Sequence, residues 1–144
     1  MGQVGEKQVG REGQVARVAL VSIVLAHLAI NIVHGQAHTG AHVPLSPAAA
    51  AFVFIVILAG PLFGLAVFRW RRRAGAWIVA ASFAGSLVFG LVNHFIIPGA
   101  DRVDHVSQEW RTLFGVTAAL LLASEAAGVA IAVRSALRAA RNTS

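Results

Sequence analysis

Four apolar runs, each long enough to cross a lipid bilayer, constrain this chain of 144 residues more than any other feature. They cover residues 18–36, 48–68, 74–97 and 112–133, and a membrane-spanning helix needs roughly 20 predominantly apolar residues. Short polar stretches with proline and glycine separate the runs, as loops do. Only 12% of the chain is charged, against about 25% in soluble domains. We therefore predict an all-α membrane protein, a bundle of four transmembrane helices.

The basic residues predict the orientation of these helices. Of the 12 lysines and arginines, only Arg102 and Arg111 lie between the first and second runs or between the third and fourth. The others flank the opposite ends of the runs, as in Arg69–Arg73. By the positive-inside rule, both termini are cytoplasmic in a multi-pass protein of the cell (plasma) membrane.

The same pattern divides the chain into three parts. Residues 1–17 are polar and glycine-rich, and we expect a disordered cytoplasmic N-terminus. Residues 18–134 form the transmembrane domain, and residues 135–144 form a cytoplasmic tail. The first apolar run is too long for the core of a signal peptide, and no clear cleavage site follows it.

Proline, glycine and serine mark the predicted helix ends. Ser46 and Pro47 provide a capping side chain and a first-turn proline for the second span. Pro98 and Gly99 should end the third span, and Ser107 is a plausible start for the fourth. Pro61 follows Gly60 inside the second span, where it should kink the helix and leave one backbone carbonyl without its helical donor.

The two halves of the chain resemble each other weakly. His34 and His42 in the first half correspond to His94 and His105 in the second, and a span follows each pair. This pattern predicts two repeated helical hairpins related by an axis along the membrane normal. The alternative is chance, because any two apolar hairpins look alike in hydropathy.

Histidines and carboxylates gather at the predicted outer ends of the spans. His34 and His38 are four residues apart, so on a helix they share a face and can chelate one ion. The chain has no cysteine and only its first residue is methionine, which excludes thiolate and thioether ligands. Mixed imidazole and carboxylate sets suit Zn, Fe, Cu(II), Ni or Mn. The candidate metal ligands are His34, His38, His42, His94, Asp101, Asp104 and His105.

Haem b is the alternative cofactor for this cluster. His34 and His94 lie at comparable depth near the ends of the first and third spans, where they could ligate a haem iron from both sides. Such a bundle is similar to the small b-type cytochromes in architecture alone, because no motif of that family is present. The histidines could also form a polar rim that caps helices, or bind a lipid headgroup or a quinone carbonyl.

Polar residues also occur deep within the spans. His27, Asn31, His34 and His38 fall within a helical stripe roughly 60° wide, which should face the bundle interior because a lipid-facing stripe would be costly. Glu125 and His27 lie at similar depths, on the order of 12 Å from the cytoplasmic side. We expect them to form an intramembrane hydrogen-bonded pair that fixes helix register or relays protons; the alternative is a packing contact without transport.

The sequence contains no Walker loop, no glycine-rich dinucleotide turn and no GxSxG motif. Three functional classes remain. The one we favour is a membrane protein that binds a transition metal or haem and is linked to redox chemistry. The second is an accessory or structural subunit of a larger membrane complex or homo-oligomer. The third is a small divalent-ion or proton-coupled transporter. The basic residues indicate contact with the lipid bilayer, not with nucleic acid.

Overall fold

The computed structural model describes residues 2–141, with side chains for residue 11 and for residues 13–141. This part of the chain is helical and contains no strand. Four segments are long and apolar enough to cross a membrane: Gly13–Gly40, Pro47–Phe68, Arg72–Ile96 and Gln108–Arg141. The predicted four-helix membrane fold is confirmed. Its elements are α1 (Gly2–Gly40), α2 (Pro47–Phe52), the π-helix η1 (Val53–Ala59), α3 (Gly60–Phe68), α4 (Arg72–Leu91), the π-helix η2 (Val92–Ile96) and α5 (Gln108–Arg141).

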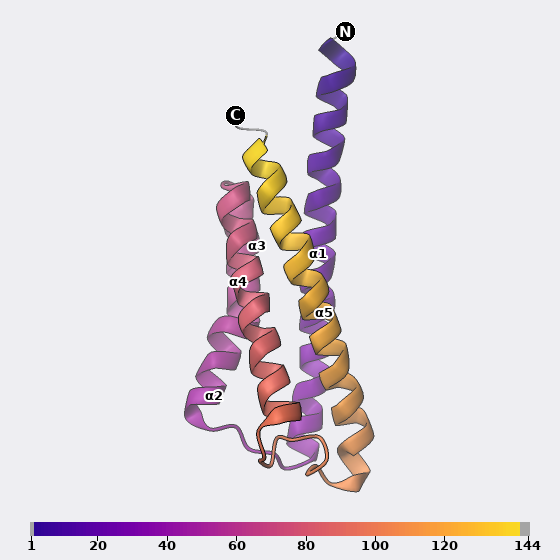
Figure 1. Ribbon diagram of the computed structural model, residues 1–144, viewed down its shortest axis with the longest axis vertical. Helices are drawn as coiled ribbons and strands as arrows, with labels where there is room; N and C mark the ends of the chain where they lie inside the picture. Colours follow the sequence, from indigo (N-terminus) through magenta and orange to yellow (C-terminus); the bar gives the residue numbers. More distant parts are fainter. Residues whose placement is uncertain (1, 142–144) are drawn as a thin grey trace.

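Residues 2–17, for which the sequence predicts disorder, are helical in the structure. They continue the helix of the first span, so that α1 begins at Gly2 and projects beyond the rest of the bundle (Figure 1). Adding residues to an existing helix avoids the cost of nucleation, which allows a polar segment to remain helical. Likewise α5 continues through Arg141, across most of the segment predicted as a tail; Met1 and residues 142–144 lie outside the described residues.

Spans that follow one another in the sequence pack side by side, except the first and second, which are nearly out of contact. The fourth span, α5, lies between α1 and α4, and α3 packs on the other side of α4 (Figure 1). Within the first predicted hairpin, contact is slight and involves α1 and α3. The third and fourth spans, in contrast, form a closely packed hairpin. The resemblance between the two halves of the sequence therefore does not extend to their packing.

Small residues allow the closest approach between helices. A Cβ atom on Gly75 of α4 would overlap the backbone of Phe68 and of Gly64 in α3. The main apolar core lies beside this contact and includes Leu20, Val79 and Phe83. It occupies the half of the bundle near the two termini, whereas His34, His38 and His94 lie in the other half and His27 packs against Phe83 at its edge.

The second span is divided by a π-helix. Pro61 lies in the first turn of α3, directly after η1. Because proline has no N–H, the carbonyl of Ile57 would lack its donor in a regular α-helix, and the imidazole of His27 lies within hydrogen-bonding reach of this carbonyl. The predicted irregularity thus takes the form of a π-helix followed by a new α-helix. Before it, α2 has no buried residue and leans away from the bundle (Figure 1).

The ends of the spans near the histidines are closed by tight turns. His42 ends α1 in the left-handed region with φ of 54°, and the Val43 N–H donates to the His38 carbonyl at 3.0 Å. The hydroxyl of Ser46 accepts a hydrogen bond from the N–H of Ala49, which confirms the predicted cap of the second span. Ala37, Val43, Val106 and Phe114 form a second apolar cluster beneath these turns.

We expect Gly75→Ala to destabilise the protein, because the added methyl group would force α3 and α4 apart. Overpacking of this kind typically costs about 1–3 kcal/mol. Thermal unfolding of the purified protein in detergent would measure the loss. Gly99→Ala is the matched control, since a Cβ at position 99 meets nothing within 4 Å. Equal melting temperatures for the two variants would contradict the close approach of α3 and α4.

Candidate metal centre

Three histidines from two spans converge at one end of the bundle. His34 and His38 lie one turn apart on α1, and His94 lies on η2 at the end of the third span. One ring nitrogen from each falls within 4.8 Å of the other two. His34 is 5% exposed and His94 is 6% exposed. This group of residues therefore lies in the protein interior. We call these three residues the histidine triad.

Phe114 of α5 forms an apolar support for the triad. Its ring centroid lies 4.8 Å from those of His34 and His38 and 5.2 Å from that of His94. Phe114 itself is fully buried. The imidazoles are therefore held from one side by a rigid hydrocarbon surface, which keeps water away from their contact.

Hydrogen bonds determine which nitrogen of each imidazole carries hydrogen. The hydroxyl of Thr117 donates to the carbonyl of Leu113 at 2.7 Å, so it accepts from Nδ1 of His34, 2.8 Å away. Nδ1 of His94 lies 3.0 Å from the Asp101 carbonyl, and Nδ1 of His38 lies 3.4 Å from the Val43 carbonyl. A carbonyl only accepts, so the Nδ1 atoms of His38 and His94 are donors, like that of His34. In the neutral imidazoles, all three Nε2 atoms consequently carry a lone pair.

Two of these Nε2 atoms face each other. Nε2 of His34 lies 3.2 Å from Nε2 of His94. Two unprotonated nitrogens at this distance repel each other unless a proton or a cation lies between them. The contact is therefore a potential binding site for a positively charged species.

Asp101, in the loop after the third span, adds a negative charge beside the triad. Its Oδ1 atom lies 3.2 Å from Nδ1 of His94 and 3.3 Å from Nε2 of His38, yet it has no hydrogen bond of good geometry. Burial raises the pKa of Asp101, but the close approach of the His94 N–H and the charges of the three histidines lower the pKa by a larger amount. The net pKa is below its ordinary value, which favours the carboxylate form.

Three of the seven predicted ligands lie elsewhere. His42 is exposed in the turn that ends α1. Asp104 pairs with Arg102, whose Nε lies 2.5 Å from its Oδ1. His105 is exposed, with Nδ1 2.8 Å from the Gly99 carbonyl. The structure brings together His34, His38, His94 and Asp101 and separates the other three candidates from them.

Sequence reasoning missed Thr117 and Phe114. Both lie on α5, three residues apart, on the face that meets α1. A threonine inside an apolar span, at the depth of His34, was the available signal, because a buried hydroxyl needs a partner. Nothing in the sequence distinguished Phe114 from the other phenylalanines of the spans.

The predicted pair of His27 and Glu125 is close but not directly hydrogen-bonded. Nδ1 of His27 lies 3.9 Å from Oε1 of Glu125, and this oxygen accepts a hydrogen bond from the hydroxyl of Ser86 instead. Asn31 donates to Nε2 of His27 at 3.0 Å. Nδ1 of His27 instead lies 3.5 Å from the hydroxyl of Ser124 on α5, next to Glu125, so these polar groups join α1, α4 and α5.

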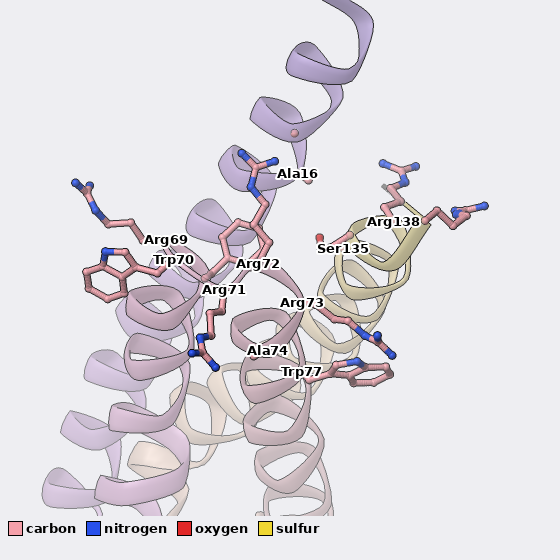
Figure 2. Close-up of a pocket in the computed structure, with 14 residues that line it drawn as sticks. Ala16, Arg69, Trp70, Arg71, Arg72, Arg73, Ala74, Trp77, Ser135 and Arg138 are labelled. Atoms are coloured by element: carbon pink, nitrogen blue, oxygen red, sulfur yellow. The ribbon is translucent and has the colours of Figure 1, made fainter. Parts of the chain in front are cut away.

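A larger pocket, of about 1020 Å³, lies at the opposite end, near the termini. Arginines and two tryptophans line it, but Figure 2 shows the guanidinium groups of Arg69, Arg71 and Arg73 pointing in different directions. Basic and tryptophan side chains that spread in this way are typical of a membrane interface. This pocket offers no converging donor set comparable to the histidine triad.

Comparison of the chain with protein-family models, with curated proteins and with solved structures finds no match.

We expect Asp104 to titrate as a partner of Arg102 and not as part of the triad. The hydrogen bond from Arg102 lowers the pKa of Asp104 to about 2. This interaction stabilises the folded protein above the ordinary carboxyl pKa of 3.8 and is lost as the pH falls through about 2. NMR titration should show the low pKa in the native protein and a rise toward 3.8 in Arg102→Gln. A pKa unaffected by this substitution would contradict the pairing.

Proposed function

We propose that this protein binds one divalent transition-metal ion through the Nε2 atoms of His34, His38 and His94. The observation that carries the proposal is the 3.2 Å contact between the Nε2 atoms of His34 and His94. With both Nδ1 atoms donating to oxygen, this contact requires a proton or a cation between the two nitrogens, and a metal ion would supply that positive charge. The bundle end would then be a binding site and not only a polar rim.

The distance between two of the triad nitrogens suits a small ion. At metal–nitrogen distances of about 2.0–2.1 Å, two nitrogens bound to a tetrahedral ion lie about 3.3 Å apart. The separation of 3.2 Å between His34 and His94 is close to this value. Three neutral imidazoles suit Zn, Cu, Ni or Fe, whereas Mg and Ca prefer oxygen ligands.

The surroundings of the triad also resemble those of metal sites. Histidine ligands almost always donate their second N–H to a carbonyl, a carboxylate or another oxygen, which fixes the ring orientation. His34 donates to Thr117, His38 to Val43 and His94 to Asp101. The charge of Asp101 would in addition offset part of the charge of the bound ion.

An isolated ion fits this arrangement better than haem b. Two axial histidines hold haem iron from opposite faces of a wide macrocycle. The ring nitrogens of His34 and His94 lie 3.2 Å apart, and the rings of His38 and Phe114 pack directly against both. This packing leaves no room for the macrocycle between them.

Three protein ligands leave one position of a tetrahedral ion open. Structural zinc sites are usually closed by four protein ligands, whereas reactive sites keep a position for water or substrate. The triad lines a cavity, toward which the open position can face. A redox role would follow for iron or copper, and a Lewis-acid role for zinc.

The central test is metal binding by the full chain, purified without a histidine tag. We expect about one Zn²⁺ per chain by elemental analysis and titration, with affinity at least about 100-fold lower in His34→Ala and His94→Ala. A loss of affinity of this size exceeds the usual effect of removing a residue that only hydrogen-bonds to a metal ligand.

His42→Ala and His105→Ala are matched controls for this test. Both remove an exposed histidine from the same end of the protein, and both should bind zinc like the native chain. A visible spectrum of the same sample reports haem directly. Absence of stoichiometric metal after reconstitution, or equal losses in all four variants, would overturn the proposal.

We expect Thr117→Val to weaken zinc binding by about 10- to 100-fold, because the acceptor that orients the His34 ring is removed. Valine has nearly the shape of threonine, so packing against Phe114 should be retained. Thr112→Val, an exposed threonine on the same helix, should leave the affinity unchanged. Titration with zinc against a competing chelator would compare the three proteins, and an unchanged affinity in Thr117→Val would argue against His34 as a ligand.

A further inference from the structure

A cavity of about 320 Å³ extends from the histidine triad toward the middle of the bundle. Polar groups lie at its two ends: the triad and Asp101 at one, and Asn31, Ser86 and Glu125 at the other. Between these ends the walls are apolar. They are formed by Val53, Ile57, Phe89, Ala118, Leu121 and Leu122.

Glu125 lines this cavity and carries a buried oxygen without a hydrogen-bond partner. The residue is only 2% exposed. Its Oε1 atom accepts from Ser86, whereas Oε2 is buried without a hydrogen-bond partner. A carboxyl oxygen in this environment is costly unless it is paired. The cavity therefore lacks a polar group at the place where Glu125 needs one.

Gly90 lines the cavity between Glu125 and the triad. A Cβ atom at position 90 would lie 3.9 Å from Oε2 of Glu125, 3.9 Å from Cδ2 of His94 and 3.5 Å from Leu122. These are ordinary van der Waals distances, so the glycine is not required by close helix packing. A longer side chain at position 90 would fill the space between the carboxyl group of Glu125 and the imidazole of His94.

One side of the cavity faces the region where the second span separates from the bundle. Leu45 and Val53 line this side. Neither α2 nor η1 packs substantially against α1, and α2, which leans away from the bundle (Figure 1), has no buried residue. A molecule dissolved in the hydrocarbon of a bilayer could enter here without crossing a polar barrier.

We propose that this cavity binds the polar head of a lipid-soluble ring compound that carries a carbonyl or hydroxyl group, the class to which quinones belong. Oε2 of Glu125 donates to a carbonyl oxygen when it carries the carboxyl proton, or accepts from a hydroxyl, and the apolar walls enclose the ring. A volume of about 320 Å³ lies at the lower end of the range for small-molecule sites and suits a ring head whose alkyl tail remains in the bilayer. This inference goes beyond metal binding and does not require a bound ion.

The test uses a decyl-substituted benzoquinone and the full chain reconstituted in lipid nanodiscs. We expect saturable binding of about one molecule per chain, above the partition into empty nanodiscs. Gly90→Leu should fill the cavity and lower the affinity at least about tenfold. Val88→Leu is the matched control, because it enlarges an exposed side chain two residues away on the same helix and should bind like the native chain.

Two substitutions at Glu125 separate hydrogen bonding from shape. Glu125→Gln keeps a hydrogen-bonding amide and should retain most of the affinity, whereas Glu125→Leu should lose about tenfold, as expected for one buried hydrogen bond. Equal binding by folded Glu125→Leu and the native chain would contradict the role of Glu125. Non-saturable uptake by the native chain, or native affinity in folded Gly90→Leu, would overturn the proposal.

A photoreactive azido-benzoquinone tests the native chain even where a variant does not fold. Labelling of Phe89, Leu121 or Leu122 supports the cavity, and labelling confined to outward-facing residues such as Val88 and Leu120 overturns it.

The binding assay is repeated with a chelator and with zinc. Saturable, Gly90-dependent quinone binding without any zinc binding would overturn only the metal proposal, whereas zinc binding without quinone saturation would overturn only this inference.

Discussion

Polar groups inside a bundle of apolar helices must be satisfied by neighbouring helices, because hydrocarbon offers no hydrogen bonds. This requirement determines how α1 lies against the rest of the protein. His34 reaches Thr117 on α5, and His27 faces Glu125 on the same helix. Side-chain contacts at these two depths fix both the rotation and the height of α1 relative to α5. The alignment of the triad depends on that register, since a rotation of α1 would separate His34 from His94.

One face of α5 serves both the triad and the cavity. Phe114, Thr117, Leu121 and Glu125 follow one another at spacings of three and four residues, the period of a single helix face. The first two support the histidines, and the last two line the space beneath them. The central position of α5 in the bundle explains why one helix can organise both sites.

Much of this arrangement follows from local patterns in the amino-acid sequence. Apolar runs of sufficient length predict the spans, and the stripe of His27, Asn31, His34 and His38 predicts which side of the first helix faces inward. The sequence did not reveal which histidines meet. His42 and His105 look as suitable as His34 and His94, but a left-handed turn and a hydrogen bond to Gly99 place them outside the site. The helical state of residues 2–17 also escaped prediction, because their composition is that of a disordered segment while their neighbour is an established helix.

Hydrophobicity and helical period are properties of neighbouring residues, and they suffice to predict a bundle of four apolar helices with histidines along the inner face of the first. The contacts of the site could not be predicted in this way. That His94 joins His34 and His38, that Thr117 orients His34, and that Ser86 and not His27 is the direct partner of Glu125 emerged from the packing of the helices. These contacts join residues far apart in the chain, so they depend on how the helices rotate against one another and on the π-helix η2 that carries His94.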